Sequence, residues 1–235
     1  MEKDNSMKIG VVILCRYNSK RLPGKILKKI NDKPILEYII ERVKEVFDND
    51  SIIIATSKEK SDEPIVRYCL NKQINFYRGS LNNVAKRFID ASKSLSLDYA
   101  IRINGDNLFV DIPTLKSISD KLATGKYQFV SNVHKRTYPK GMSIEGVDSN
   151  YYEKKLRHFT EKEDREHVTL KLYKSPPSNT FFIYNKEVKG VEGLQLAVDT
   201  EKDLNISSEI IYRMTKHHTQ YNLKEIFEIY KKLMI

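Results

Sequence analysis

Four cations crowd one short segment of the chain, residues 15–25, which reads CRYNSKRLPGK. They are Arg16, Lys20, Arg21 and Lys25, and a Pro-Gly pair interrupts the segment. Positive charges this close repel one another unless an anion lies among them. Arginine offers a planar fork to two oxygens and lysine a compact point charge, so the segment could surround the phosphates of a nucleoside triphosphate. The alternative interpretation is a solvated basic turn.

Two aspartates form the second chemical pattern. Asp106 stands in INGDN just after an apolar run, and Asp199 stands in LAVDTEKD in the same setting. Two carboxylates at neighbouring strand ends, together with phosphate oxygens, suit Mg²⁺. The competing role for each alone is a helix N-cap, because aspartate is a favoured cap. Asp203 could add a ligand or lie on the surface of the helix that follows.

The histidines and cysteines predict less chemistry. His167 in DREHVT is open between substrate contact and helix packing, whereas His217 and His218 are predicted to face solvent. The sequence has no P-loop, GxGxxG, HExxH or GxSxG pattern. Cys15 and Cys69 lack metal or redox spacing, which favours a reducing compartment, the cytoplasm.

Alternating strands and helices must position these residues. Continuous apolar runs predict strands buried on both faces, and amphipathic stretches between them predict helices. Such alternation predicts right-handed crossovers and a doubly wound, mostly parallel α/β sheet, whose ligands bind at the carboxyl ends of the strands. The predicted order is strand 8–15, helix 33–47, strand 51–57, helix 62–72, strand 74–80, helix 82–95, strand 98–105 and helix 112–123.

Beyond Gly125 the pattern becomes less regular. We expect a single domain over residues 1–235, with a small substrate-facing and dimerisation lobe at about 134–185. The predicted elements here are strand 127–133, helix 159–174, strands 179–185 and 193–199, and a mostly helical tail from Thr200.

The composition fits a globular protein with an anionic partner. Of the 235 residues, 40% are hydrophobic and 31% charged, and the formal net charge is +10. The lysines and arginines are spread along the chain without the signature of an RNA-binding module, so we expect no nucleic-acid partner. No apolar run approaches the roughly 20 residues of a membrane span, and the start MEKDNSMK does not read as a signal peptide.

Seven stretches in order resemble one enzyme family. They are CRYNSKRLPGKIL, IIIATS, FYRGSLNNVAKRF, RINGDN, RTYPKG, REHVT and VDTEKDL. Together they resemble the cytidylyltransferases that include the CMP-sialic acid and CMP-Kdo synthetases, especially the spore coat polysaccharide (SpsF) branch. The resemblance implies a Rossmann-like nucleotidyltransferase fold, CTP as a substrate, Mg²⁺ or Mn²⁺ as the cofactor, and a homodimer.

The resemblance also assigns roles by position. Arg16, Arg21, Lys25 and Asp106 would be catalytic, with Asp106 and Asp199 holding the metal. The expected acceptor contacts are Asn132, Arg136, Tyr138, Glu145, Arg165 and His167. The expected nucleotide contacts are Leu14, Arg16, Ser19, Arg21, Lys25, Ala55, Thr56, Ser57, Arg78, Gly79, Asn104 and Gly105.

Two positions depart from the family pattern. Leu14-Cys15 stand where an alanine usually precedes the first arginine, and Asn107-Leu108 stand where the SpsF-like chains tend to have Cys-Pro. The second departure lies beside the expected metal ligand and leaves the acceptor open.

The residues and the resemblance together predict transfer of a nucleotidyl group, with release of pyrophosphate. The resemblance implies that the acceptor is a sugar, a sugar acid or a phosphorylated polyol used in surface polysaccharide or glycoconjugate synthesis. A metal-dependent glycosyltransferase acting on a nucleotide-sugar is the alternative. A non-catalytic nucleic-acid binder and a regulatory nucleotide-binding domain are further alternatives.

Overall fold

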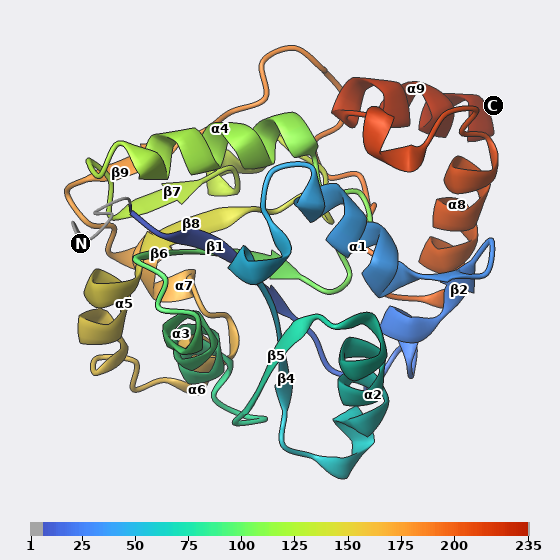
Figure 1. The fold of residues 1–235 in the computed structure, drawn as a ribbon. Helices are drawn as coiled ribbons and strands as arrows, with labels where there is room; N and C mark the ends of the chain where they lie inside the picture. Colours follow the sequence, from blue (N-terminus) through green and yellow to red (C-terminus); the bar gives the residue numbers. More distant parts are fainter. Residues whose placement is uncertain (1–6, 235) are drawn as a thin grey trace, which may run out of the picture.

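One mixed sheet organises the molecule. The computed structural model describes residues 7–234. Within them the main sheet has seven strands in the order β5-β4-β1-β6-β8-β7-β9 (Figure 1). Its strands are β1 (Ile9–Leu14), β4 (Ile52–Ser57), β5 (Asn75–Gly79), β6 (Tyr99–Asn104), β7 (Phe129–Ser131), β8 (Glu145–Asp148) and β9 (Thr180–Phe182).

Parallel pairing dominates the amino-terminal half. β1 lies between β4 and β6 and pairs in parallel with both, so that Ile13 stands level with Ile54 and Ile103. β8 is antiparallel to both β6 and β7, whereas β9 is parallel to β7. The predicted mostly parallel α/β sheet is therefore confirmed. A separate hairpin joins β2 (Lys29–Ile30) to β3 (Lys33–Pro34).

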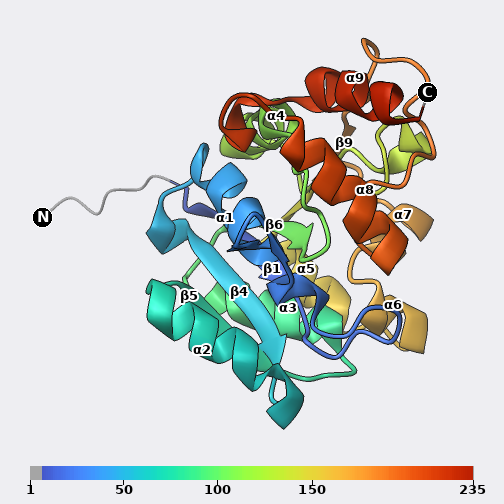
Figure 2. The same cartoon turned by 90° about the vertical axis from the view of Figure 1, so that its right-hand side faces the viewer.

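Helices cover both faces of this sheet (Figures 1 and 2). Side chains alternate along β1, so Val11 and Ile13 join one hydrophobic cluster while Val12 and Leu14 join the other. The first cluster lies under α1 (Ile35–Lys44), α2 (Glu63–Lys72), α4 (Ile112–Ala123), α8 (Glu201–Tyr212) and α9 (Leu223–Leu233). The second lies under α3 (Val84–Ser94), α5 (Ser149–Leu156) and α7 (Leu170–Lys174), with α6 (Lys162–Glu166) beside α3.

Side-chain caps set the starts of the later helices. The side chain of Asp111 accepts a hydrogen bond from the amide of Thr114 at the start of α4. Thr200 with Asp203, and Asn222 with Glu225, form reciprocal capping boxes at the starts of α8 and α9. Single 3-10 turns complete the chain: η1 (Lys25–Leu27), η2 (Asn49–Ser51), η3 (Lys60–Asp62), η4 (His134–Arg136) and η5 (His218–Gln220).

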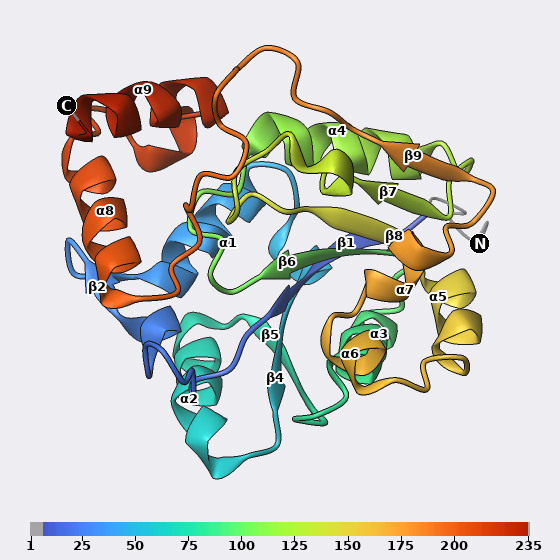
Figure 3. The ribbon, with the colours of Figure 1, turned by 180° about the vertical axis from the view of Figure 1, so that it is seen from behind.

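The predicted strand 193–199 is wrong. This segment runs across the carboxyl ends of the strands before α8 begins (Figure 3). Its one sheet-like contact is an isolated parallel bridge from Gln195 to Lys140, and the amide of Val198 instead donates to the carbonyl of Asp106 at 3.1 Å. Gly141 allows the approach, because a Cβ there would lie 2.3 Å from the nitrogen of Ala197.

The predicted helix 159–174 is divided. Val168 adopts φ 52° between α6 and α7, a left-handed conformation that is costly for a β-branched residue and ends a helix. Its side chain is fully buried, and its carbonyl accepts a 2.7 Å hydrogen bond from the hydroxyl of Tyr152. Burial of this turn therefore overrides the helical pattern.

The segment 134–185 contributes to the main sheet. Its strand β8, which the sequence did not predict, lies between β6 and β7. Part of the expected lobe is thus built into the domain. No helix within residues 7–234 is both long and apolar enough to cross a bilayer.

Candidate active site

The basic segment 15–25 leaves the carboxyl end of β1 and folds back on itself. The amide of Gly24 donates a 2.8 Å hydrogen bond to the carbonyl of Tyr17, whose own amide donates to Asp62 at 2.7 Å. Gly24 has φ 67°, and a Cβ there would lie 3.0 Å from the Tyr17 ring, so glycine suits this turn. The turn leads directly into η1 and places Lys25 at its start.

Lys25 joins the two aspartates. Its Nζ lies 3.0 Å from Oδ2 of Asp106 and 3.0 Å from Oδ1 of Asp199. These two oxygens are therefore at most 6.0 Å apart, the sum of the two distances. Arg21 contacts the same oxygen of Asp199 at 2.9 Å. The structure thus brings together four residues that the sequence singled out, of which Lys25 and Asp199 are 174 positions apart.

The backbone of Asp199 is held by the cap of α8. The carboxylate of Asp203 accepts hydrogen bonds from the amides of Asp199 and Thr200, at 3.1 and 2.8 Å. Asp203 is therefore a helix-capping residue that positions Asp199. Gln195 donates to the other oxygen of Asp199 at 3.3 Å.

A cavity of about 530 Å³ opens beside this cluster. Its size lies within the range of small-molecule sites. It contains ten residues expected in the site: Leu14, Arg16, Ser19, Arg21, Lys25, Asn104, Gly105, Asp106, His167 and Asp199. Seven further residues line it that were not assigned as individual contacts, although Lys20 belongs to the predicted basic segment: Cys15, Lys20, Ile26, Val84, Arg87, Arg102 and Glu166.

The cavity wall carries excess positive charge. Six cationic side chains line it against three carboxylates, those of Asp106, Glu166 and Asp199. Burial raises the pKa of the Cys15 thiol well above its ordinary value, so this side chain lines the cavity without charge. The balance favours a polyanionic ligand.

Arg102 links the cavity to Glu145. Its guanidinium pairs with Glu145 and donates to Oδ1 of Asn104 at 2.9 Å. Glu145 also accepts from Thr169 at 2.6 Å and from Tyr173 at 2.7 Å, and it lies outside the cavity wall. In this structure Glu145 orients Arg102. The RINGDN motif contains Arg102 and could have identified it.

Arg87 is a second unexpected cation. It lies on α3, is only 3% exposed and donates to the carbonyl of Ser80 at 2.8 Å. Among the described residues, its Nε and that of Arg102 have no hydrogen-bond partner. Burial lowers the pKa of Arg87, although the neighbouring Cys15 and Asp62 partly oppose this. The quoted stretch FYRGSLNNVAKRF contains this residue.

Five expected nucleotide contacts lie outside the cavity wall. Thr56 and Ser57 are fully buried and donate their hydroxyls to Oδ2 of Asp62, while Arg78 pairs with Glu63 at 3.0 Å. Their polar groups are engaged within the protein, at the turn that connects β4 with α2. The five are Ala55, Thr56, Ser57, Arg78 and Gly79.

The expected acceptor residues are dispersed. His167 is exposed and lines the cavity, whereas Arg165 donates to the carbonyl of Phe159 at 3.0 Å. Asn132 is buried; its side-chain amide donates to the carbonyl of Met142 and accepts from the amide of Ile144. The structure does not bring this set to one wall.

Two further acceptor candidates lie away from the cavity. Arg136 lies in η4, outside the wall. Tyr138 accepts from Thr114 at 3.2 Å and lines a separate cavity of about 390 Å³ beside the starts of α4 and α9.

The prediction that His218 faces solvent is wrong. Its side chain is 6% exposed, because it packs edge-on against Tyr38 and contacts Glu41. His217 is exposed, as expected.

Comparisons with known proteins find relatives that cover nearly the whole chain. The chain is 36% identical over 205 residues to an uncharacterised protein of Methanocaldococcus jannaschii, covering 87% of this chain and 83% of that protein. It is 27% identical over 226 residues to the spore coat polysaccharide biosynthesis protein SpsF of Bacillus subtilis, covering 93% and 92%. A solved cytidylyltransferase from Leptospira borgpetersenii matches with a TM-score of 0.88 and 26% identity, covering 97% and 95%.

The family assignment rests on nearly the whole chain. Residues 10–232 match the sequence model described as cytidylyltransferase. The match includes the basic segment, both aspartates and the capping box that supports Asp199. The chain therefore belongs to the cytidylyltransferase family.

Proposed function

We propose that the protein is a CTP-dependent cytidylyltransferase, which transfers CMP to a sugar, a sugar acid or a phosphorylated polyol and releases pyrophosphate. Family membership supports cytidylyl transfer, and the likeness to SpsF supports a role in polysaccharide synthesis. One observation carries the proposal most directly, namely the contact of Lys25 with both Asp106 and Asp199 at the wall of a cationic cavity.

In the proposed reaction, an acceptor oxygen attacks the α-phosphorus of CTP and the bond to pyrophosphate breaks. Arg16, Arg21 and Lys25 would hold the phosphate oxygens and stabilise the charge that moves onto the leaving pyrophosphate. Fixed charges of this kind lower a barrier because they need no reorganisation during the reaction. The hydrogen bonds around Gly24 and Tyr17 hold the segment in its shape before the substrate arrives.

The two aspartates fit a divalent ion such as Mg²⁺ or Mn²⁺. Both present hard oxygen donors, and both already contact the same cationic group, Lys25 Nζ, at 3.0 Å. When bound, the ion would neutralise phosphate oxygens and act as a Lewis acid. Asp203 would keep Asp199 in place through the amide hydrogen bond of 3.1 Å.

The acceptor would enter on the side of Arg102 and His167, which line the same cavity. Arg102 is held by Glu145 and could bind an anionic acceptor group. His167 is the candidate proton acceptor for a hydroxyl nucleophile, whereas an acceptor phosphate would need none.

The test is pyrophosphate release with ATP, GTP, CTP and UTP, each against a panel of sugars, sugar acids and polyol phosphates, with and without Mg²⁺. We expect release with CTP only, and only with Mg²⁺ and a matching acceptor. The control for Asp106→Asn is Asp120→Asn, the same substitution at an exposed aspartate on α4. Equal activity of these two variants would contradict the assignment. Transfer from a nucleotide-sugar without pyrophosphate release would favour a glycosyltransferase.

The proposal includes a cytoplasmic homodimer, which the resemblance supports. Size-exclusion chromatography with light scattering would measure the mass, and a monomer at working concentration would contradict the dimer.

A further inference from the structure

Three side chains of metal-ligand type meet outside the wall of the cavity. Glu41 lies on α1, whereas His217 and His218 precede and begin η5, the turn between α8 and α9. One ligand atom from each lies within 4.8 Å of the other two. No sequence motif marks the group, because Glu41 and His218 are 177 positions apart.

The ligand atoms are arranged around one carboxylate oxygen. Oε2 of Glu41 lies 2.5 Å from Nε2 of His218 and 3.7 Å from Nε2 of His217. Ligand atoms of a tetrahedral zinc site lie about 3.4 Å apart, given bonds of about 2.0–2.2 Å. The His217 distance is close to this spacing, whereas the hydrogen bond between Glu41 and His218 must open, with loss of its proton, when an ion binds. The side chain of His217 is 54% exposed and can adjust its rotamer, and it gives an ion a route from solvent.

Neighbouring residues fix the position of the histidines. Arg42 is fully buried and donates to the backbone carbonyls of His218, Tyr221 and Val110. Nδ1 of His217 lies 2.9 Å from the hydroxyl of Thr219. Such a contact on the second ring nitrogen is typical of metal-binding histidines, because it orients the ring and leaves Nε2 for the ion.

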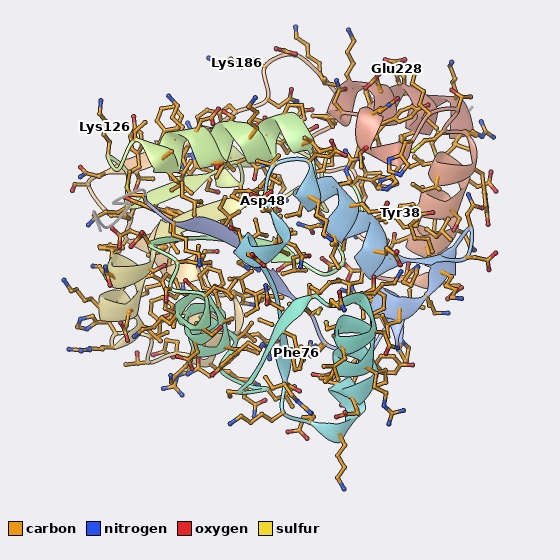
Figure 4. All side chains as sticks on the ribbon, in the orientation of Figure 1. Tyr38, Asp48, Phe76, Lys126, Lys186 and Glu228 are labelled. Carbon is orange, nitrogen blue, oxygen red and sulfur yellow. The ribbon has the colours of Figure 1, made fainter. Side chains whose placement is uncertain are left out.

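We propose that Glu41, His217 and His218 bind a transition-metal ion of the Zn²⁺ type, at a second site separate from the aspartate pair. Two imidazoles and one carboxylate suit Zn²⁺, whereas the all-oxygen aspartate pair suits Mg²⁺. Three protein ligands leave a fourth position for water. The site would connect α1 with the turn between α8 and α9. These two helices lie on the same side of the molecule as Tyr38 of α1 (Figure 4).

Lys33 is the competitor for this site. Its Nζ lies 2.7 Å from Oε2 of Glu41, the oxygen that the ion would use. Binding of the metal therefore requires this lysine to move aside, which its partly exposed flexible side chain permits. Removing Lys33 should strengthen metal binding, an effect opposite to that of removing a ligand.

The experiment is calorimetric titration of Zn²⁺ into the full, untagged protein in the presence of saturating Mg²⁺. We expect saturable binding of one ion and a rise in the thermal unfolding midpoint. His217→Ala should weaken binding by about 10- to 100-fold or more, and Glu41→Gln should do the same. Lys33→Met should strengthen it, and Co²⁺ should give the absorption bands of a tetrahedral N/O site.

Two matched variants separate this site from others. His158→Ala removes an exposed histidine outside the group, and Asp106→Asn removes a ligand of the proposed catalytic metal. Both should bind Zn²⁺ as the wild type does. The proposal is overturned if no saturable binding occurs at micromolar Zn²⁺. It is also overturned if His217→Ala binds Zn²⁺ as tightly as the wild type does. The same holds if Asp106→Asn abolishes the heat of Zn²⁺ binding.

Discussion

The basic segment 15–25 is held near its two ends by carboxylates of different kinds. Near its start, Asp62 is 1% exposed and accepts from neutral donors, the amides of Tyr17 and Ser57 and two hydroxyls. At its end, Asp106 and Asp199 have side chains 24% and 21% exposed and contact the charged groups of Lys25 and Arg21.

The difference separates a structural carboxylate, Asp62, from the two carboxylates proposed to be catalytic. Neutral donors inside the core cannot be exchanged without leaving buried polar groups unpaired, so Asp62 fixes the shape of the segment. Charged partners at a cavity wall can change contacts when a ligand binds. Asp106 and Asp199 are therefore able to bind a metal ion, while the lysine and arginine that now contact them turn to a phosphate. Substitutions at the two ends should therefore affect different measurements.

The largest effect is expected for Asp106→Asn. Loss of one charge from the pair should lower kcat for pyrophosphate release by about 10³-fold, the upper range for removing one preorganised electrostatic group. The unfolding midpoint should stay close to that of the wild type, because the side chain is partly exposed. Steady-state kinetics and thermal unfolding of the same sample would check both. A large drop in the unfolding midpoint would instead show that Asp106, like Asp62, is a structural carboxylate.

Lys25→Met should have the next largest effect. Its ammonium group contacts both aspartates, so its loss should lower kcat/KM by about 10²-fold. Lys25→Arg retains the charge but changes its shape, and should recover only part of the loss. Kinetics with CTP varied would measure this. If Lys25→Met raised KM alone and left kcat unchanged, the lysine would bind ground state and transition state equally.

The parallel half of the fold could be predicted because β1 and β4 contain continuous apolar runs and amphipathic stretches separate the four strands. The meeting of Asp106 with Asp199 was also predictable, although its reason was not. Asp199 follows no strand, since the segment 193–199 crosses the strand ends and bonds to Lys140 and to Asp106 itself.

Long-range partners could not be predicted. The short strand β8 pairs with β6 and β7 without a distinct apolar run, and Val168 breaks a helical pattern because its burial outweighs its backbone preference. The family resemblance assigns Thr56 and Ser57 to the nucleotide, and nothing in the sequence shows that Asp62 accepts hydrogen bonds from their hydroxyls.

Asp62→Asn should mainly change stability. Burial alone would raise the pKa of Asp62, but hydrogen bonds from Ser57, Tyr17 and Thr56 lower it overall. The ionised form thus stabilises the fold above the ordinary aspartate pKa of about 3.9, and this contribution is lost as the pH falls through the folded pKa. At pH 7 we expect a loss of about 2 kcal/mol in the free energy of unfolding.

Chemical denaturation of wild type and Asp62→Asn from neutral to acid pH would measure this loss. The difference between them should shrink as the pH falls, because protonation removes the same charge from the wild type. A constant difference would mean that packing, and not ionisation, explains the loss.

The smallest effect is expected for Thr56→Val, which nearly preserves shape and removes one hydroxyl. That hydroxyl donates to Asp62 at 2.9 Å inside the core, so its loss should lower the free energy of unfolding by about 1 kcal/mol. KM for CTP should stay within about twofold, because the side chain is fully buried and outside the cavity wall. Thr160→Val, at an exposed position, is the matched control. If Thr56→Val instead raised KM for CTP about tenfold at unchanged stability, Thr56 would contact the nucleobase, as the family resemblance implies. The end of β4 would then be part of the substrate site together with Asp106 and Asp199.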